Sequence, residues 1–127
     1  MSVIYLAGPM SGYTEFNFPE FDWYAGVLRH DGYAVISPAE LDRADGFDEK
    51  GCTGNEALTV ELRQRFARND ITAILQADEV VMLPGWRHST GATNEARIAS
   101  WLGVPISEWI NGALDPVEPL EMWSGTG

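Results

Sequence analysis

A chain of 127 residues, 45% hydrophobic and 21% charged, is long enough for one globular domain with a buried core. Its 8 basic and 19 acidic residues give a net charge of −11, which disfavours binding to nucleic-acid polymers and to anionic membrane surfaces. Cys52 is the only cysteine, which excludes an internal disulfide, and no apolar stretch is long enough to cross a bilayer or to act as a signal peptide. We therefore expect a cytoplasmic protein.

The first third of the chain predicts a strand, a helix and a second strand. Residues 3–7 are a short apolar run, typical of a strand buried on both faces. A helix is expected over 17–30, with Asn17 as its capping residue. Residues 33–36 predict the second strand.

Residues 39–55 are rich in Asp and Gly and show no clear periodicity. They predict a long loop, a kind of segment that is often functional in compact domains. Asp42, Asp45 and Asp48 are three apart rather than two apart as in a calcium loop, and we expect them to face solvent.

The rest of the chain continues the alternation, with a helix expected over 56–76, a strand over 79–83, a helix over 89–102 and a strand starting at 104–106. Strands separated by helices predict an α/β fold, a doubly wound parallel sheet of four or five strands with helices on both faces. We expect one domain over 1–127, with its core at about 3–106. In the tail, 107–127, Trp109 and Trp123 are candidates for an interface.

Ligands of such sheets bind beyond the carboxyl ends of the strands. Glu95 lies on the apolar stripe of the helix that follows the third predicted strand, three residues after Ala92 and four before Ala99. A carboxylate there points at the ligand edge, near the positive end of the helix dipole. The alternative is a glutamate in a capping box, but that box requires Ser or Thr at position 92.

Asp70 is the charged member of a second apolar stripe, on the long helix with Leu62, Phe66 and Ala73. The alternative is a surface salt bridge to a nearby arginine, Arg63 or Arg68. Two carboxylates that converge on a strand-end pocket suit glycosidic chemistry, in which one attacks the anomeric carbon and the other handles protons.

Other candidates have structural alternatives of comparable weight. Ser89 and Gly91 at a helix start suit an anion site, but Ser89 also suits simple N-capping. Trp86 and Phe16 can stack on a nucleobase or pack in the core. Asp78 precedes a strand, where acids often cap a turn. No histidine or cysteine pair has metal-ligand spacing, so we expect no metal and no cofactor.

These residues carry a resemblance. The opening Tyr5-Leu6-Ala7-Gly8-Pro9, the Asn69-Asp70 pair, Ala77-Asp78 and the Ser89, Gly91, Glu95 series resemble the nucleoside 2-deoxyribosyltransferase superfamily, which includes the 2'-deoxynucleoside 5'-monophosphate N-glycosidases. The GPMSG, NFPEF and SPAEL segments are similar to its small branch from phages and prophages. The resemblance covers about 3–106 and implies a flavodoxin-like fold.

The resemblance also implies an enzyme that cleaves or transfers the N-glycosidic bond of 2'-deoxynucleosides or their monophosphates. Glu95 would be the nucleophile that forms a covalent deoxyribosyl-enzyme, Asp70 would assist as acid or base, and Tyr5 would orient Glu95. Substrate would lie along the residues after the first strand and beside the other candidates: Gly8, Pro9, Met10, Ser11, Phe16, Asp78, Trp86, Ser89 and Gly91. A homo-oligomer is expected, because neighbouring subunits commonly complete such sites.

One departure concerns phosphate. The N-glycosidases carry an arginine after the opening strand, whereas this chain has Pro9-Met10-Ser11-Gly12 there, so we favour a nucleoside over a nucleotide. Arg87 beside Ser89 is the candidate replacement. The alternatives to this enzyme are a non-catalytic nucleotide-binding module of the same fold and a phosphoribohydrolase of the lysine-decarboxylase-like type. Against the latter, Trp86 stands where its Pro-Gly-Gly loop has a second glycine.

Overall fold

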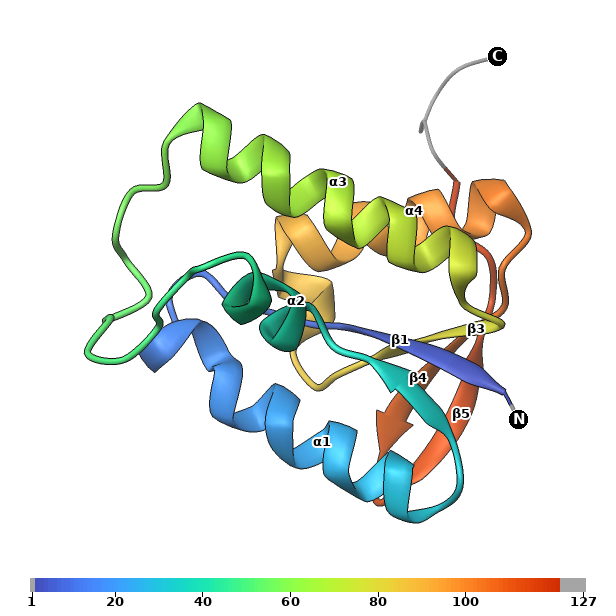
Figure 1. Ribbon diagram of the computed structural model, residues 1–127. Helices are drawn as coiled ribbons and strands as arrows, with labels where there is room; N and C mark the ends of the chain where they lie inside the picture. Colours follow the sequence, from blue (N-terminus) through green and yellow to red (C-terminus); the bar gives the residue numbers. More distant parts are fainter. Residues whose placement is uncertain (1, 122–127) are drawn as a thin grey trace.

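The computed structural model describes residues 2–121, and its centre is a five-stranded sheet in the order β2-β1-β3-β4-β5 (Figure 1). The strands are β1 Val3–Ala7, β2 Ala34–Ile36, β3 Glu79–Met82, β4 Ile106–Ile110 and β5 Ala113–Val117. β1 to β4 pair in parallel, and β5 pairs antiparallel with β4. The predicted α/β fold is confirmed.

Helices cover both faces of this sheet (Figure 1). They are α1 Phe18–His30, α2 Pro38–Ala44, α3 Val60–Gln76 and α4 Thr90–Leu102. α1 lies on one face, α3 and α4 lie on the other, and α2 packs against α1, α3 and β1. Within residues 2–121, no helix is both long and apolar enough to span a membrane.

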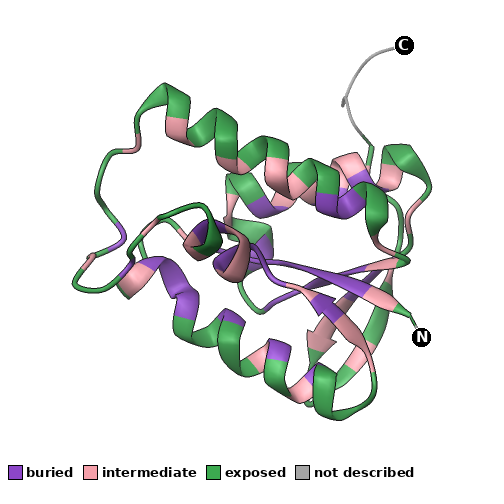
Figure 2. Cartoon of the chain, in the orientation of Figure 1, coloured by how far each residue is buried: buried purple, intermediate pink, exposed green. Residues whose placement is uncertain are grey.

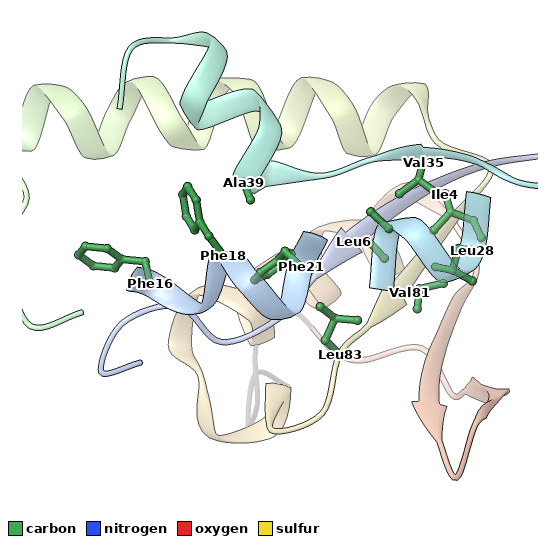
Figure 3. Packing of buried hydrophobic residues seen from close by; sticks show 11 residues of the cluster. Ile4, Leu6, Phe16, Phe18, Phe21, Leu28, Val35, Ala39, Val81 and Leu83 are labelled. Atoms are coloured by element: carbon green, nitrogen blue, oxygen red, sulfur yellow. The ribbon is translucent and has the colours of Figure 1, made fainter. Parts of the chain in front are cut away.

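The face under α1 is filled by large apolar side chains, which we call the α1-side core (Figure 3). Its fully buried members come from β1, from β3 and its end, and from α1: Ile4, Leu6, Val81, Leu83, Phe18, Phe21 and Leu28. Because alternate residues of a strand point to opposite faces, Ile4 and Leu6 lie on this side and Tyr5 on the other.

The opposite face, the α3/α4-side core, combines large residues such as Ile74, Met82 and Trp86 with many small ones. Besides Tyr5 it contains five buried alanines, contributed by β1, α3 and α4: Ala7, Ala73, Ala92, Ala96 and Ala99. Figure 2 shows β1 buried along most of its length between the two layers. The small side chains allow the helices to lie close to the strands and leave room for polar groups among them.

The prediction of a loop over 39–55 is wrong at its start, where the chain forms α2. Ser37 occupies the N-cap position and Pro38 the first helical position, where its missing N–H costs nothing. Asp42 on this helix is only 3% exposed, so the expectation that it faces solvent is wrong, whereas Asp45 and Asp48 are exposed.

The long helix starts four residues later than expected. Thr59 caps α3, since its Oγ1 accepts a hydrogen bond from the Leu62 N–H. Glu56, expected inside the helix, instead accepts hydrogen bonds from the N–H groups of Thr53 and Gly54 and so stabilises the preceding loop.

Two features of the tail differ from expectation. β4 continues to Ile110, and the Asn111-Gly112 turn, with φ of 51° and 81°, leads into β5. Positive φ at both positions is the signature of a tight type I′ hairpin turn. Trp109 packs against Tyr24 of α1 with ring centroids 5.4 Å apart, so it belongs to the fold. Trp123 lies outside the described residues.

The segment after β1 adopts an unusual backbone. Glu15, Phe16 and Asn17 all have positive φ, between 52° and 65°. Asn17 occupies the N-cap position of α1 as expected, but its side chain makes no capping hydrogen bond; its Nδ2 donates to the Pro9 carbonyl, 2.9 Å away. Gly54 of the long loop packs so tightly on this segment that a Cβ there would lie 2.0 Å from the Tyr13 carbonyl oxygen.

Candidate active site

Tyr5, Asp70 and Glu95 come together on the α3/α4 side of the sheet. Tyr5 lies in the middle of β1, and its hydroxyl donates a hydrogen bond to Oε2 of Glu95 on α4. Asp70 projects from α3 beside them, and its Oδ1 is buried without a hydrogen-bond partner. Three elements that are separated in sequence thus place one phenol and two carboxyls in the same space.

The surroundings of Glu95 disfavour its ionised form. Burial and the neighbouring charge of Asp70 raise the pKa of Glu95 well above its usual value, while the hydrogen bond from the Tyr5 hydroxyl acts in the opposite direction. Burial and the charges of Glu95 and Asp70 raise the pKa of Tyr5, so the phenol keeps its proton and remains a donor.

Asp70 titrates near neutrality. Burial raises the pKa of Asp70 to about 7, and the Tyr5 hydroxyl partly offsets that shift. The alternative of a surface salt bridge is not supported, because neither Arg63 nor Arg68 forms an ion pair with it in the described part of the chain. Two neighbouring, partly desolvated carboxyls beside one phenol cannot easily both be ionised, so near pH 7 the pair holds a proton.

Asp42 of α2 belongs to the same cluster. Burial, followed by the charges of Asp70 and Asp45, raises the pKa of Asp42 to about 8, and its Oδ1 is buried without a partner. Sequence reasoning missed this residue because the short helix was not recognised. The Ser37-Pro38 start signal was the pattern from which α2 could have been predicted.

No arginine or lysine of the described chain forms an ion pair with the carboxyl cluster. The ion pairs within residues 2–121 join Arg29 to Glu40, Arg43 to Asp22 and Glu49, Arg65 to Asp45, and Arg87 to Glu108. Within residues 2–121, no three His, Cys, Asp or Glu side chains are arranged to hold a metal ion.

Several residues expected at the substrate have structural partners. A Cβ at Gly8 would lie 2.9 Å from the Cβ of Leu83, so close packing alone requires glycine there. Ser89 caps α4, its Oγ accepting from the Ala92 N–H, and Gly91 lies exposed in the first turn. Pro9 accepts from Asn17 through its carbonyl, Met10 packs against the α1-side core, and Ser11 is exposed.

The two aromatic candidates are not exposed stacking platforms. Trp86 is buried, donates from Nε1 to Glu108 at 3.2 Å and is covered by the Arg87 guanidinium. Phe16 is buried in the α1-side core and contacts Phe47 edge to face. For both residues the core alternative describes the packing.

Asp78 lies at the N-terminal end of β3, whereas the loops 8–12 and 83–89 follow the C-terminal ends of β1 and β3. It precedes β3, and its Oδ2 accepts a hydrogen bond from the Val3 N–H at 2.8 Å. The turn-capping alternative therefore describes its contacts, and the structure does not bring Asp78 to Glu95.

Known proteins share this arrangement of elements. A solved structure of a 2-deoxyribosyltransferase from the psychrotolerant bacterium Bacillus psychrosaccharolyticus superimposes with a TM-score of 0.62 at 27% identity, over 84% of this chain and 71% of that one. A comparison with curated protein sequences finds no match. Residues 2–108 match the family described as a domain of unknown function, DUF4406, and cover most of the chain. The chain therefore belongs to the DUF4406 family, with the α/β fold of the 2-deoxyribosyltransferases.

Proposed function

We propose that this protein is an enzyme that cleaves or transfers the N-glycosidic bond of 2'-deoxynucleosides, with Glu95 as the nucleophile. The observation that carries the proposal is the hydrogen bond from Tyr5 to Glu95 beside the unpartnered carboxyl of Asp70. The similarity to a 2-deoxyribosyltransferase supports the same reaction class.

The geometry suits a double displacement. The Glu95 carboxylate attacks C1' of the sugar, the base departs with the bonding electron pair, and a covalent deoxyribosyl-enzyme remains. Tyr5 holds Glu95 by donating to Oε2, which favours the ionised form that the attack requires. A second base or a water molecule then attacks C1' and releases Glu95.

Asp70 supports both steps. With a pKa raised to about 7 it is able to gain or lose a proton near neutral pH, and its free Oδ1 is available to a sugar hydroxyl or to the base. A proton on Asp70 removes the repulsion between the two carboxyls, which favours the ionised form of Glu95 that the attack requires.

The substrate is a nucleoside in preference to its 5'-monophosphate. The carboxyl cluster forms no ion pair with a described arginine or lysine, and Arg87, the candidate for a phosphate contact, is paired with Glu108 at 2.6 Å. A phosphate in such surroundings would meet negative charge without compensation.

A non-catalytic nucleotide-binding module is less well supported. Buried, unpartnered carboxyls destabilise the fold, and a protein that only binds has no need to keep them, whereas catalysis uses their shifted pKa values. If a bound nucleoside is recovered intact after prolonged incubation with an excess of the protein, the binding module is favoured.

The test is a chromatographic assay of the four 2'-deoxynucleosides and their 5'-monophosphates, with and without an acceptor base. We expect the wild-type protein to release or exchange the base of a nucleoside, and Glu95→Gln to lose at least ~10³-fold in kcat because the nucleophile is removed. Mass spectrometry of protein quenched with substrate should detect one deoxyribosyl group attached to Glu95.

The matched control is Glu61→Gln, an exposed glutamate in the first turn of α3, which should retain wild-type activity. Absence of turnover of every substrate would contradict the proposal, as would full activity of Glu95→Gln. The yields with and without acceptor base distinguish transfer from hydrolysis.

A further inference from the structure

A groove of about 430 Å³ lies on the α1 side of the sheet, outside the candidate active site. It is lined by the start of α1 and by the turn after β3, through Tyr13, Asn17, Glu20, Tyr24 and residues 83–85. Sites for small molecules have volumes of roughly 300–1,000 Å³, so the groove is large enough for one. None of the lining residues belongs to the carboxyl cluster of the candidate active site.

The groove lies at a position where sheets of this strand order bind ligands. β1 and β3 are neighbours, and the order reverses between them, because β2 lies beyond β1 and β4 lies beyond β3. Ligands bind at such a reversal, outside the carboxyl ends of the strands. The segments that follow β1 and β3 supply Tyr13 and residues 83–85. Leu83 belongs to the α1-side core, whereas Tyr5 belongs to the α3/α4-side core, so the groove is a second crevice at this end of the sheet.

A glycine keeps one end of the groove open. Gly85 has a φ of 86°, a backbone conformation that other residues adopt only with strain. A Cβ at this position would lie 3.1 Å from the hydroxyl of Tyr13. The absence of a side chain therefore leaves the space beside this hydroxyl free.

The polar side chains of the groove attract positive charge. Glu20 forms no ion pair within residues 2–121, and no arginine, lysine or histidine lines the groove. The Nδ2 of Asn17 donates to the Pro9 carbonyl, which leaves the amide oxygen of Asn17 as an acceptor. On a chain with a net charge of −11, an unpaired carboxylate in a groove favours a cationic ligand and disfavours an anionic one.

The aromatic side chains of the groove favour a ligand with an apolar body. Tyr13 is exposed, and Tyr24 is held by edge contacts with Trp23 and Trp109, with ring centroids 4.9 and 5.4 Å away. Burial, followed by the charge of Glu20, raises the pKa of Tyr24, so its hydroxyl remains protonated beside the carboxylate. Tyrosine rings attract organic cations as well as aromatic rings.

We propose that this groove is a second binding site, for a small aromatic ligand that carries a positively charged amino group. The amino group binds to the Glu20 carboxylate and to the amide oxygen of Asn17. The aromatic body packs against Tyr13 and against residues 83–85. The site goes beyond the proposed function and does not depend on it, because its ligand has no need to reach Glu95.

The test is an NMR titration of the ¹⁵N-labelled protein with two probes, benzylamine and benzyl alcohol. The probes share a ring, but only benzylamine is positively charged at neutral pH. We expect the largest amide shifts at the residues that line the groove: Tyr13, Asn17, Glu20, Tyr24 and Gly85. Benzylamine should bind about 3- to 10-fold more tightly than benzyl alcohol, as for one charged contact near the surface.

Glu20→Gln removes the charge and keeps the size of the side chain. It should weaken benzylamine binding by about 3- to 10-fold and leave benzyl alcohol binding unchanged, so the preference between the probes is lost. Tyr13→Leu should weaken benzylamine binding by about 3-fold through loss of the aromatic ring. The matched control is Glu61→Gln, which removes the same charge from the first turn of α3 and should bind both probes as wild type does.

Equal affinity of the wild-type protein for both probes would overturn the proposal, as would amide shifts centred outside the groove. An unchanged preference in Glu20→Gln would also overturn it, and a lower Tm of that variant would then assign Glu20 to stabilisation of α1 through the helix dipole. Glu95→Gln should bind benzylamine as wild type does, and a loss of binding there would show that the two sites are not separate. The readout is binding, so absence of nucleoside turnover would contradict the proposed function and leave this inference intact.

Discussion

The two faces of the sheet use the same strands for different purposes. Ile4 and Leu6 of β1 enter the α1-side core among phenylalanines and leucines, whereas Tyr5 between them enters the α3/α4-side core among alanines. The first face is filled with apolar volume, whereas the second holds the hydrogen-bonded pair of Tyr5 and Glu95 beside Asp70, whose Oδ1 is buried without a partner. A single strand thus separates the residues that stabilise the fold from those that we assign to chemistry.

This division has an energetic logic. Burial of a carboxyl whose pKa is raised to about 7 or 8 lowers the free energy of unfolding at neutral pH. Large buried aromatic and aliphatic side chains each stabilise a fold by roughly 1.5–3 kcal/mol. The α1-side core therefore offsets the destabilisation that the carboxyl cluster imposes, as is common for active sites.

The largest effect that tests this comparison is on the α1 side. Phe21→Ala removes a fully buried ring and should lower the free energy of unfolding by about 3–5 kcal/mol, measured by chemical denaturation. Under conditions where the variant remains folded, its kcat should stay within a few-fold of wild type. Trp23→Ala, on the exposed face of α1, is the control and should cost less than about 1 kcal/mol. A loss of kcat in folded Phe21→Ala comparable to that of the next variant would show that the two faces are not separate.

Tyr5→Phe tests the other face with the smallest change in volume. Loss of the donor to Glu95 should reduce kcat/KM by about 10- to 100-fold, a transition-state effect of roughly 1.4–2.7 kcal/mol. Without the hydroxyl the pKa of Glu95 rises further, so a higher pH is needed to ionise it, and the acidic limb of the pH profile should move upward. Tyr33→Phe, which packs on the α1 side, should show neither change. An unshifted acidic limb in Tyr5→Phe would contradict the role assigned to this hydrogen bond.

The most gradual effect concerns stability as a function of pH. Asp70 has its pKa raised to about 7 in the folded protein, against about 4 for an unfolded aspartate. Between these values the folded state keeps a proton that the unfolded state has lost, so the contribution of Asp70 to stability is most favourable below pH 4 and is lost as the pH rises to 7. The slope due to this group is at most about 1.4 kcal/mol per pH unit.

Denaturation curves collected from pH 4 to pH 8 measure that slope. Asp70→Asn should flatten it, and Asp115→Asn, an exposed residue of β5, should leave it unchanged. A steeper fall in Asp70→Asn than in wild type would show that Asp70 is ionised in the folded protein.

The elements with strong local signals could be predicted from the sequence. β1, α1, β3 and α4 combine an apolar run or stripe with clear boundaries, and the structure confirms each within one or two residues. α2 was missed because a helix of two turns is too short to show a period. β5 was not predicted although Asn111-Gly112 is a hairpin signal, because Pro116 within the segment argues against a strand.

The candidate site was predictable only in part, for a physical reason. Glu95 and Asp70 interrupt long apolar stripes, so their inward orientation can be read from periodicity. The burial of Asp42 depends on how α2 packs against α3 and β1, which no local pattern encodes. Conversely, Trp86 and Phe16 were assigned to substrate because they are aromatic, and tertiary packing places both in the interior.

The hairpin that closes the sheet also bears on aggregation. β5 is an edge strand, and an unpaired edge can recruit a strand from another molecule. In its middle it carries Asp115, whose charge disfavours stacking, and Pro116, which lacks the N–H that such a neighbour would need. Replacing this pair with β-branched residues would keep the pairing with β4 but expose a continuous hydrogen-bonding edge, so these two positions protect the folded chain against fibrillar self-assembly.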